Sequence, residues 1–204
     1  MKAYLYGASA EYALHSLLIM LARKEPVSVR DLARFQILPQ RFLAKVFTRL
    51  KRAGLVNGIE GISGGFALAR SPEQISVMEV LEAVDPNRSF FECAEIRRNC
   101  ELFGSTPPIW SVAGPCRIHL VMQEAELAAR SVLTSKSLAG LGREFEHKAP
   151  DEFMRAAESW FHQSRNARTN SKPGRCRNDG SQRHPCSSGN RCKHSPNSKE
   201  NHHD

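Results

Sequence analysis

The stretch that decides the fold is PQRFLAKVFTRLKRAG, residues 39–54. Pro39 suits the first turn of a helix and Gly54 suits the position just past its end, so a helix is expected between them. One face of this helix is apolar and contains Phe42, Leu43, Val46, Phe47 and Leu50. The opposite face is polar and mostly basic, and contains Arg41, Lys45, Thr48, Arg49 and Arg52. This pattern predicts an amphipathic helix that packs on a core and presents cations to solvent.

Two further helical patterns precede this helix. SAEYALHSLLIMLARK, residues 9–24, has apolar residues at helical spacing, with Ser9 as the expected N-cap. VSVRDLARFQ, residues 27–36, is a shorter pattern, with Ser28 as N-cap and Asp31 three residues later. Because a residue before proline disfavours the helical conformation, Leu38 is expected to lie in the turn between the second and third helices.

A hairpin signal follows the basic helix. LVNGIEGISGGFALAR, residues 55–70, contains two short apolar runs around a glycine-rich turn, and another helix is expected at about 76–84. This order of elements predicts a winged helix-turn-helix domain over residues 1–84, in a mainly α fold with a small β-wing. Such a domain places its basic helix in the major groove and its hairpin against phosphates. The residues expected to contact DNA are Ser28, Pro39, Gln40, Arg41, Lys45, Thr48, Arg49 and Ser63.

A basic helix face can also be no more than a solvated exterior. The preceding helix and turn, together with the following hairpin, favour DNA binding over that interpretation.

Residues 85–119 form a polar, proline-interrupted segment that holds three cysteines and a histidine. The spacing Cys93-x6-Cys100-x15-Cys116-x2-His119 matches neither the paired CxxC of zinc fingers nor the cysteine runs of ferredoxins. Three thiolates and an imidazole can bind zinc or an iron–sulfur cluster. Metal binding is favoured over free thiols here, but the spacing does not select the metal.

Residues 120–163 are expected to hold a long dimerisation helix and a short C-terminal amphipathic helix. The long pattern runs from Leu120 to about residue 141, and the short one covers residues 151–164. Winged-helix proteins with such a helix are usually dimers, because two-fold half-sites need two recognition helices roughly 34 Å apart. The alternative is that the long helix packs back on its own domain.

The C-terminal segment 164–204 differs in composition from the rest of the 204-residue chain. It contains nine Lys/Arg and three Asp/Glu, so 9 − 3 = 6 of the net charge of +8 lies there, and it has no Leu, Ile, Val, Met or aromatic ring other than histidine. A segment with so little to bury is predicted to be a disordered basic tail that adds non-specific phosphate attraction. Its cysteines and histidines show no repeated spacing; they are Cys176, Cys186, Cys192, His184, His194, His202 and His203.

The sequence contains no apolar run of eighteen residues and no pattern of a secretion signal. A cytoplasmic protein is therefore expected. Cysteines in a reducing compartment favour metal binding or redox chemistry over structural disulfides.

Several segments together resemble the IscR/NsrR family of bacterial winged-helix regulators over residues 1 to about 141. They are EYAL (11–14), LPQRFLAKVFTRLKRAGLV (38–56), GISGGFALAR (61–70), ISVMEVLEAV (75–84) and the cysteines that follow. The resemblance implies a homodimer that binds a palindromic operator and senses iron–sulfur, redox or nitric oxide status. It also implies that Cys93, Cys100 and Cys116 hold an iron–sulfur cluster, with [2Fe-2S] favoured over [4Fe-4S].

The same resemblance leaves three options for a further ligand. His119 resembles the ligand within the loop of the regulator of cluster assembly, and Glu11 resembles the aspartate that nitric oxide sensors contribute from the partner subunit. Glu11 with His15 resembles the pair of a redox-sensing relative, and their i, i+4 spacing places both on one helical face.

Two departures from the family limit what carries over. The fifteen-residue gap before Cys116 is longer than in the best-known members, so the cluster type is not inherited. Relatives commonly carry Ser-x-Arg-Gly in the wing, where this chain has an acidic residue, Glu60, which repels phosphate. The operator sequence and affinity are therefore not inherited either.

Three other functions compete with a cluster-dependent regulator. The first is the same regulator without a cluster, acting through its thiols or through zinc. The second is an iron–sulfur carrier or electron-transfer protein, which needs neither a basic helix face nor a wing. An enzyme is not expected, because the sequence shows no nucleophile–base pair and no phosphate-binding loop.

Overall fold

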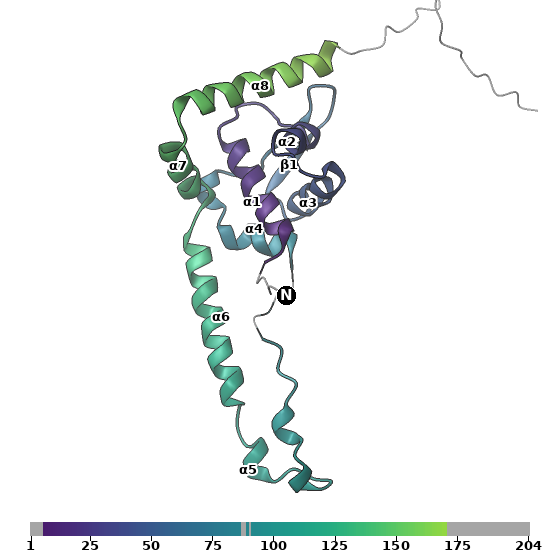
Figure 1. Cartoon of the computed structure of the whole chain (residues 1–204), viewed down its shortest axis with the longest axis vertical. Helices are drawn as coiled ribbons and strands as arrows, with labels where there is room; N and C mark the ends of the chain where they lie inside the picture. Colours follow the sequence, from purple (N-terminus) through teal and green to yellow (C-terminus); the bar gives the residue numbers. More distant parts are fainter. Residues whose placement is uncertain (1–5, 87–88, 90, 171–204) are drawn as a thin grey trace, which may run out of the picture. The chain divides into compact units, whose positions relative to one another are not determined.

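The computed structural model describes residues 6–86, 89 and 91–170. The N-terminal part is mainly α with one small β-hairpin (Figure 1), which confirms the predicted fold class. Its elements are α1 (Ala8–Leu21), α2 (Val29–Phe35), α3 (Gln40–Arg52), β1 (Val56–Ile59), β2 (Gly65–Leu68) and α4 (Val77–Val84).

Helix α1 begins two residues earlier than its sequence suggests. Gly7 occupies the N-cap position, and Ser9 lies inside the helix, so the prediction of Ser9 as the cap was wrong. The buried face of α1 includes three small residues, Ala10, Ala13 and Ser16, which let neighbouring helices approach closely. The buried Ser16 hydroxyl donates a hydrogen bond to Gln36 Oε1 at 2.8 Å, so this buried polar group has a hydrogen-bond partner.

The helix–turn–helix unit forms as predicted. The Ser28 side chain caps α2 by accepting a hydrogen bond from the Asp31 amide at 3.1 Å. In the turn that follows, Ile37 adopts a left-handed conformation with φ of 55°. Pro39 occupies the N-cap of α3, and Gly54 follows the end of α3 with φ of 70°, as its place in the sequence predicts.

The core lies where α1, α2, α3, α4 and the hairpin meet. The α3 side chains Leu43, Val46, Phe47 and Leu50 are buried in it, whereas Phe42 remains partly exposed. Phe42 instead meets the Tyr12 ring edge-on, with ring centroids 5.4 Å apart. Other fully buried core residues include Leu17, Leu32, Leu55, Val56, Ile75, Val80 and Val84.

The hairpin pairs β1 with β2 in antiparallel register, with Val56 opposite Leu68 and Ile59 opposite Gly65. A third segment joins it, because Val27 and Phe66 exchange backbone hydrogen bonds of 2.9 and 2.8 Å. Gly65 makes this contact possible. A Cβ atom at residue 65 would lie 2.5 Å from the carbonyl carbon and oxygen of Val27, which is too close for any side chain.

Helix α4 begins with a capping box. Ser76 Oγ accepts from the Glu79 amide at 3.2 Å, and Glu79 accepts from the Ser76 amide at 2.8 Å. A salt bridge of 2.7 Å joins Glu79 to Arg70. The observed helix, Val77–Val84, agrees with the prediction.

The cysteine-bearing segment contains short helical turns rather than an open loop. These are two 3-10 turns, Ile96–Arg98 and Glu101–Phe103, and the short helix α5 (Ile109–Val112). Helix α6 follows over Arg117–Ser135 and ends earlier than predicted, and α7 occupies Leu138–Lys148.

The prediction of a single helix that reaches about residue 141 is therefore wrong. The helix is interrupted because residues 136–138 form backbone hydrogen bonds with residues 75–77. The Val77 amide donates to the Lys136 carbonyl, and the Leu138 amide donates to the Ile75 carbonyl, both at 2.8 Å. The Ser137 side chain then caps α7.

Helix α8 spans Asp151–Asn170 and continues beyond the predicted boundary at residue 164. Two arginines beyond that boundary form ion pairs with the N-terminal domain: Arg165 with Glu25, and Arg168 with Asp31. These contacts explain why the helix continues. The predicted disordered tail beyond residue 170, with its cysteines and histidines, lies outside the described residues. Among the residues that are described, no helix is long and apolar enough to cross a membrane.

Candidate nucleic-acid interface and cysteine segment

The solvent-facing side of α3 carries the predicted polar residues. Arg41, Lys45, Thr48 and Arg49 are all exposed, as is Gln40 at the start of the helix. Because the opposite side is buried in the core, the orientation of this face relative to the domain is fixed. The structure therefore places these five side chains on one surface.

The residues of this surface are not equivalent. Arg49 Nη1 donates a hydrogen bond to the Val84 carbonyl at the end of α4, so its guanidinium is engaged within the domain. Thr48 Oγ1 donates to the Ala44 carbonyl at 2.9 Å, one turn earlier in its own helix. Arg41 and Lys45 form no ion pair or hydrogen bond with the described residues through their side chains. They are the two cations best placed to meet an external anion.

The other predicted DNA contacts lie around this surface. The half-buried Ser28 uses its hydroxyl to cap α2, and Pro39 is exposed in the turn before α3. Ser63 is half-buried in the tip of the hairpin, while Glu60 is fully in solvent at the same tip. The structure thus confirms that Glu60 is exposed near the tip of the hairpin, and its predicted repulsion of phosphate stays a prediction.

In the cysteine segment the structure brings two of the three thiols together. The Cys93 thiol contacts Glu95 Oε1 at 3.8 Å and lies close enough to Cys116, at the N-terminus of α6, to help lower the pKa of the Cys116 thiol. Cys100 is exposed and is not among the groups that shift the pKa of Cys116. Figure 1 shows the segment and α5 beside the N-terminal end of α6.

The surroundings of Cys116 favour its thiolate form. The backbone N–H of His119 contributes most to lowering the pKa of the Cys116 thiol, followed by the N–H of Ile118, the charge of Arg97 and the Cys93 thiol. Arg97 is held in place by hydrogen bonds of 2.9 Å to Glu95 and 3.0 Å to the Gly114 carbonyl. A thiolate here is a stronger nucleophile and a stronger metal ligand than an ordinary cysteine.

The three candidate further ligands differ in their environment. His119 Nδ1 is buried and has no hydrogen-bond partner among the described residues, beside a Phe91 ring whose centroid is 6.3 Å away. Glu11 and His15 are both exposed on α1. Within the described part of one subunit, no three Cys, His, Asp or Glu side chains converge on a point that suits a metal ion.

The donor chemistry of this segment nevertheless fits an iron–sulfur cluster in two respects. Cys93 and Cys116 supply adjacent sulfur atoms, with backbone N–H groups directed at one of them. The buried, unpartnered Nδ1 of His119 is a free ligand atom in the same segment. Cys100, the third thiol, is exposed, and these donors do not form a group of three suited to a metal ion within the described part of one subunit.

The sequence analysis did not predict the contacts of α8 with the N-terminal domain. The partners Asp31 and Arg168 are 137 residues apart in the chain (168 − 31), and the sequence motif that includes Asp31 concerns only the start of α2. The only available signal was the arginine pair of α8, Arg165 and Arg168, which was assigned to the basic tail.

Comparison with known proteins agrees with this architecture. Residues 6–144 match the model of the Rrf2 family, described as iron-dependent transcriptional regulators. The regulator NsrR of Geobacillus kaustophilus is 31% identical over 134 residues, which are 64% of this chain and 84% of the relative. The regulator IscR of Cereibacter sphaeroides is 40% identical over 83 residues, 39% of this chain and 54% of the relative.

Two solved structures share the fold. The IscR of T. potens aligns with a TM-score of 0.53 at 21% identity, covering 76% of this chain and 96% of that one. The cysteine regulator CymR of B. subtilis aligns with a TM-score of 0.52 at 22% identity, covering 71% of this chain and 98% of that one. With a helix-turn-helix, a β-wing and a family match over more than half its length, the chain belongs to the Rrf2 family of transcriptional regulators.

Proposed function

We propose that this protein binds double-stranded DNA as a homodimer, at a palindromic operator, with α3 in the major groove and the β1–β2 hairpin against the adjacent phosphates. The observation that carries this proposal is the exposed face of α3, on which Arg41 and Lys45 have no described partner within the domain. Cations left free on a helix whose other side is buried are suited to base edges and phosphates.

The dimer is supported by α6. None of its 19 residues is buried, and Ile118, Val121, Leu127 and Val132 are between 59 and 64% exposed. A helix with so much exposed apolar surface is typical of an interaction site. A second copy of the same helix supplies a matching apolar face under two-fold symmetry.

The DNA affinity of the dimer is proposed to depend on an iron–sulfur cluster held by Cys93, Cys100 and Cys116. His119 is the favoured further ligand, because its Nδ1 is buried without a described partner. A bound cluster would supply a centre that reacts with oxidants or nitric oxide. The role of the chain is to present the thiolates, with Arg97 and the first N–H groups of α6 stabilising the charge on Cys116.

The second candidate is a thiol-dependent regulator without a cluster. It is favoured by one observation: Cys93 is near enough to Cys116 to help lower the pKa of the Cys116 thiol, whereas the exposed Cys100 is not among the groups that do so. Under this alternative the pair senses oxidants directly, and Cys100 is dispensable.

One experiment tests the two candidates together. The protein is purified without oxygen, its absorption spectrum and its iron and sulfide content are measured, and its DNA affinity is determined with a duplex selected from a random palindromic library. Visible absorption that is lost in Cys100→Ala as well as in Cys93→Ala and Cys116→Ala supports the cluster. Colourless protein whose DNA affinity responds to oxidant, even in Cys100→Ala, supports the thiol pair instead. Failure to select any DNA sequence would contradict both.

A further inference from the structure

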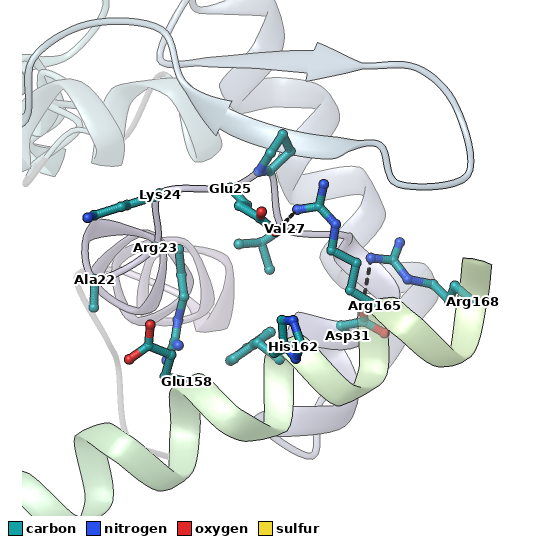
Figure 2. Close-up of a pocket in the computed structure, with 12 residues that line it drawn as sticks. Ala22, Arg23, Lys24, Glu25, Val27, Asp31, Glu158, His162, Arg165 and Arg168 are labelled. Carbon is teal, nitrogen blue, oxygen red and sulfur yellow. Dashed lines mark hydrogen bonds and ion pairs between the residues drawn. The ribbon is translucent and has the colours of Figure 1, made fainter. Parts of the chain in front are cut away.

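A cavity of about 310 Å³ lies between α8 and the segment that joins α1 to α2 (Figure 2). This volume lies at the lower end of the range of small-molecule sites. Four cationic and three acidic side chains line it, together with His162 and the apolar side chains of Val27 and Phe161. The cavity is separate from both the face of α3 and the cysteine segment.

Two ion pairs hold the wall formed by α8. Arg165 pairs with Glu25, and Arg168 Nη2 lies 3.1 Å from Asp31 Oδ2. Figure 2 shows both arginines reaching from α8 toward the α1–α2 connection and α2. These two pairs hold α8 against the N-terminal domain and engage only one oxygen of Asp31, Oδ2.

Two other polar atoms at the cavity are buried without a partner. Asp31 is only 2% exposed, and its Oδ1 accepts no hydrogen bond from any described residue. On the opposite wall, Arg23 Nε is also buried and donates to no described residue. Buried polar atoms of this kind are uncommon, and each carries a desolvation cost unless water or a ligand satisfies it.

Arg23 is held in a fixed position. Its guanidinium lies over the Phe161 ring, 4.6 Å from the ring centroid. Figure 2 shows the side chain extending from the end of α1 toward Glu158 on α8. The cavity thus offers an anchored cationic donor on one wall and an anchored anionic acceptor on another.

We propose that this cavity binds a free α-amino acid, with its carboxylate on Arg23 and its ammonium group on Asp31 Oδ1. A simple anion would accept a hydrogen bond from Arg23 but would leave Asp31 Oδ1 without a donor. A simple amine would donate to Asp31 Oδ1 but would leave Arg23 Nε without an acceptor. A small zwitterion satisfies both atoms, and charge-assisted hydrogen bonds of this type are the strong ones. The apolar surface of Phe161 and Val27 is available to the side chain of the amino acid.

Arg168 connects the cavity to the β1–β2 hairpin, so ligand binding in the cavity can affect the wing. The same guanidinium that pairs with Asp31 also donates from Nη1 to the Gly64 carbonyl at the tip of the hairpin, at 3.4 Å. The ammonium group of a ligand bound to Asp31 would compete with Arg168 for the Asp31 carboxylate. Arg168 would then be held less firmly, and its hydrogen bond from α8 to the Gly64 carbonyl of the wing would weaken. This second step rests on the proposed function, because it assumes that the wing contacts DNA.

Binding is tested on the full chain by thermal-shift measurements with each of the twenty common L-amino acids, followed by calorimetry on those that raise the melting temperature. The N-acetyl and the amide derivatives of each hit serve as ligand controls, because they remove the ammonium charge and the carboxylate respectively. We expect at least one amino acid to bind and both of its derivatives to bind about tenfold more weakly or worse. No binding by any amino acid, or equal binding of the derivatives, would overturn the proposal.

Matched variants locate the site. Arg23→Met and Asp31→Asn should each weaken binding by about tenfold or more, whereas Arg155→Met and Glu152→Gln, at exposed positions of α8 outside the cavity, should not. Since Asp31→Asn also weakens the pair with Arg168, Arg23→Met is the decisive variant if Asp31→Asn proves unstable. Undiminished binding to Arg23→Met would overturn the assignment.

The link to the wing has a separate readout. DNA affinity is measured with and without the bound amino acid, in wild type and in Arg23→Met. A change in wild type alone supports the link, and an unchanged affinity overturns it. If the protein binds no DNA at all, the proposed function fails, while the calorimetric result still decides the binding site.

Discussion

Helices α3 and α6 both carry apolar side chains at helical spacing, but only α3 buries such side chains fully within the described chain. The 13-residue α3 buries Leu43, Val46, Phe47 and Leu50 in the core and leaves a polar face in solvent. The 19-residue α6 buries no side chain and leaves an apolar face in solvent. The difference teaches that α3 derives its stability from its own domain, whereas α6 leaves apolar side chains in solvent, which is typical of an interaction site.

The largest expected effect comes from truncating a buried side chain of α3. Phe47→Ala should lower the free energy of unfolding by about 3–5 kcal/mol, because it removes a fully buried ring that packs against Phe66. Urea denaturation measures this loss. Phe42→Ala on the same helix is the control, since Phe42 is 38% exposed and should cost much less. Equal losses would show that α3 is not anchored as described.

The next largest effect concerns the exposed apolar side chains of α6. The double change Val121→Ala with Leu127→Ala should weaken dimerisation by roughly 3 kcal/mol, because two exposed apolar side chains lose the surface they bury against a second copy. Sedimentation equilibrium gives the dimer Kd, and circular dichroism should show unchanged helix content. Gln123→Ala, at a polar exposed position of the same helix, serves as the control. An unaltered Kd in the double variant would contradict the α6 interface.

A third prediction separates two arginines of α3. Arg41→Ala should cost about 1–3 kcal/mol in DNA binding and leave stability unchanged. Arg49→Ala should instead lower stability by about 1 kcal/mol, since the Val84 carbonyl loses its donor. Fluorescence anisotropy with labelled duplex and urea denaturation distinguish the two effects. If both variants lost DNA affinity equally at unchanged stability, the contact between Arg49 and α4 would not persist in solution.

The smallest effect is expected in α4, which packs against both helices. Hydrogen bonding from the Ser76 amide, and then the contact with Arg70, hold the pKa of Glu79 below its usual value of 4.5. A lowered carboxyl pKa contributes stability above pH 4.5 that is lost as the pH falls through the folded-state value.

Glu79→Gln should therefore reduce the loss of stability on acidification, by no more than about 0.5 kcal/mol because the group is partly exposed. Urea midpoints at pH 7 and at pH 3.5 measure this change, with Glu146→Gln on α7 as control. An unchanged pH dependence would argue against the capping box in solution.

Local patterns predicted most of the N-terminal domain, because its signals lie close together in the chain. Ser28, Pro39 and Gly54 act on residues within one helical turn; Ser28 and Gly54 occupy their predicted positions, and Pro39 lies one residue before the first turn, at the N-cap. The cap of α1 was wrong because Gly7, which has no side chain to offer, takes the position instead of Ser9.

Errors beyond this domain have a common cause in distant contacts. The break between α6 and α7 depends on Ile75 and Val77, some sixty residues earlier in the chain, and the extension of α8 depends on Glu25 and Asp31. In the candidate site, the engagement of Arg49 by the Val84 carbonyl is likewise absent from any local pattern. Cys93 lies near Cys116 because the segment between them turns back on itself. The number of residues between two cysteines does not predict such a turn.

The close approach of the hairpin to Val27 has a practical meaning for anyone who redesigns the DNA specificity of this protein. Positions 64 and 65 must stay glycine in any library, because a Cβ atom at residue 64 would lie 2.1 Å from the Ile59 carbonyl oxygen and one at residue 65 would collide with Val27. Glu60, by contrast, is exposed and can be randomised freely. A selection that varies residue 60 together with Arg41 and Lys45 therefore explores new operators while the scaffold that carries them is preserved.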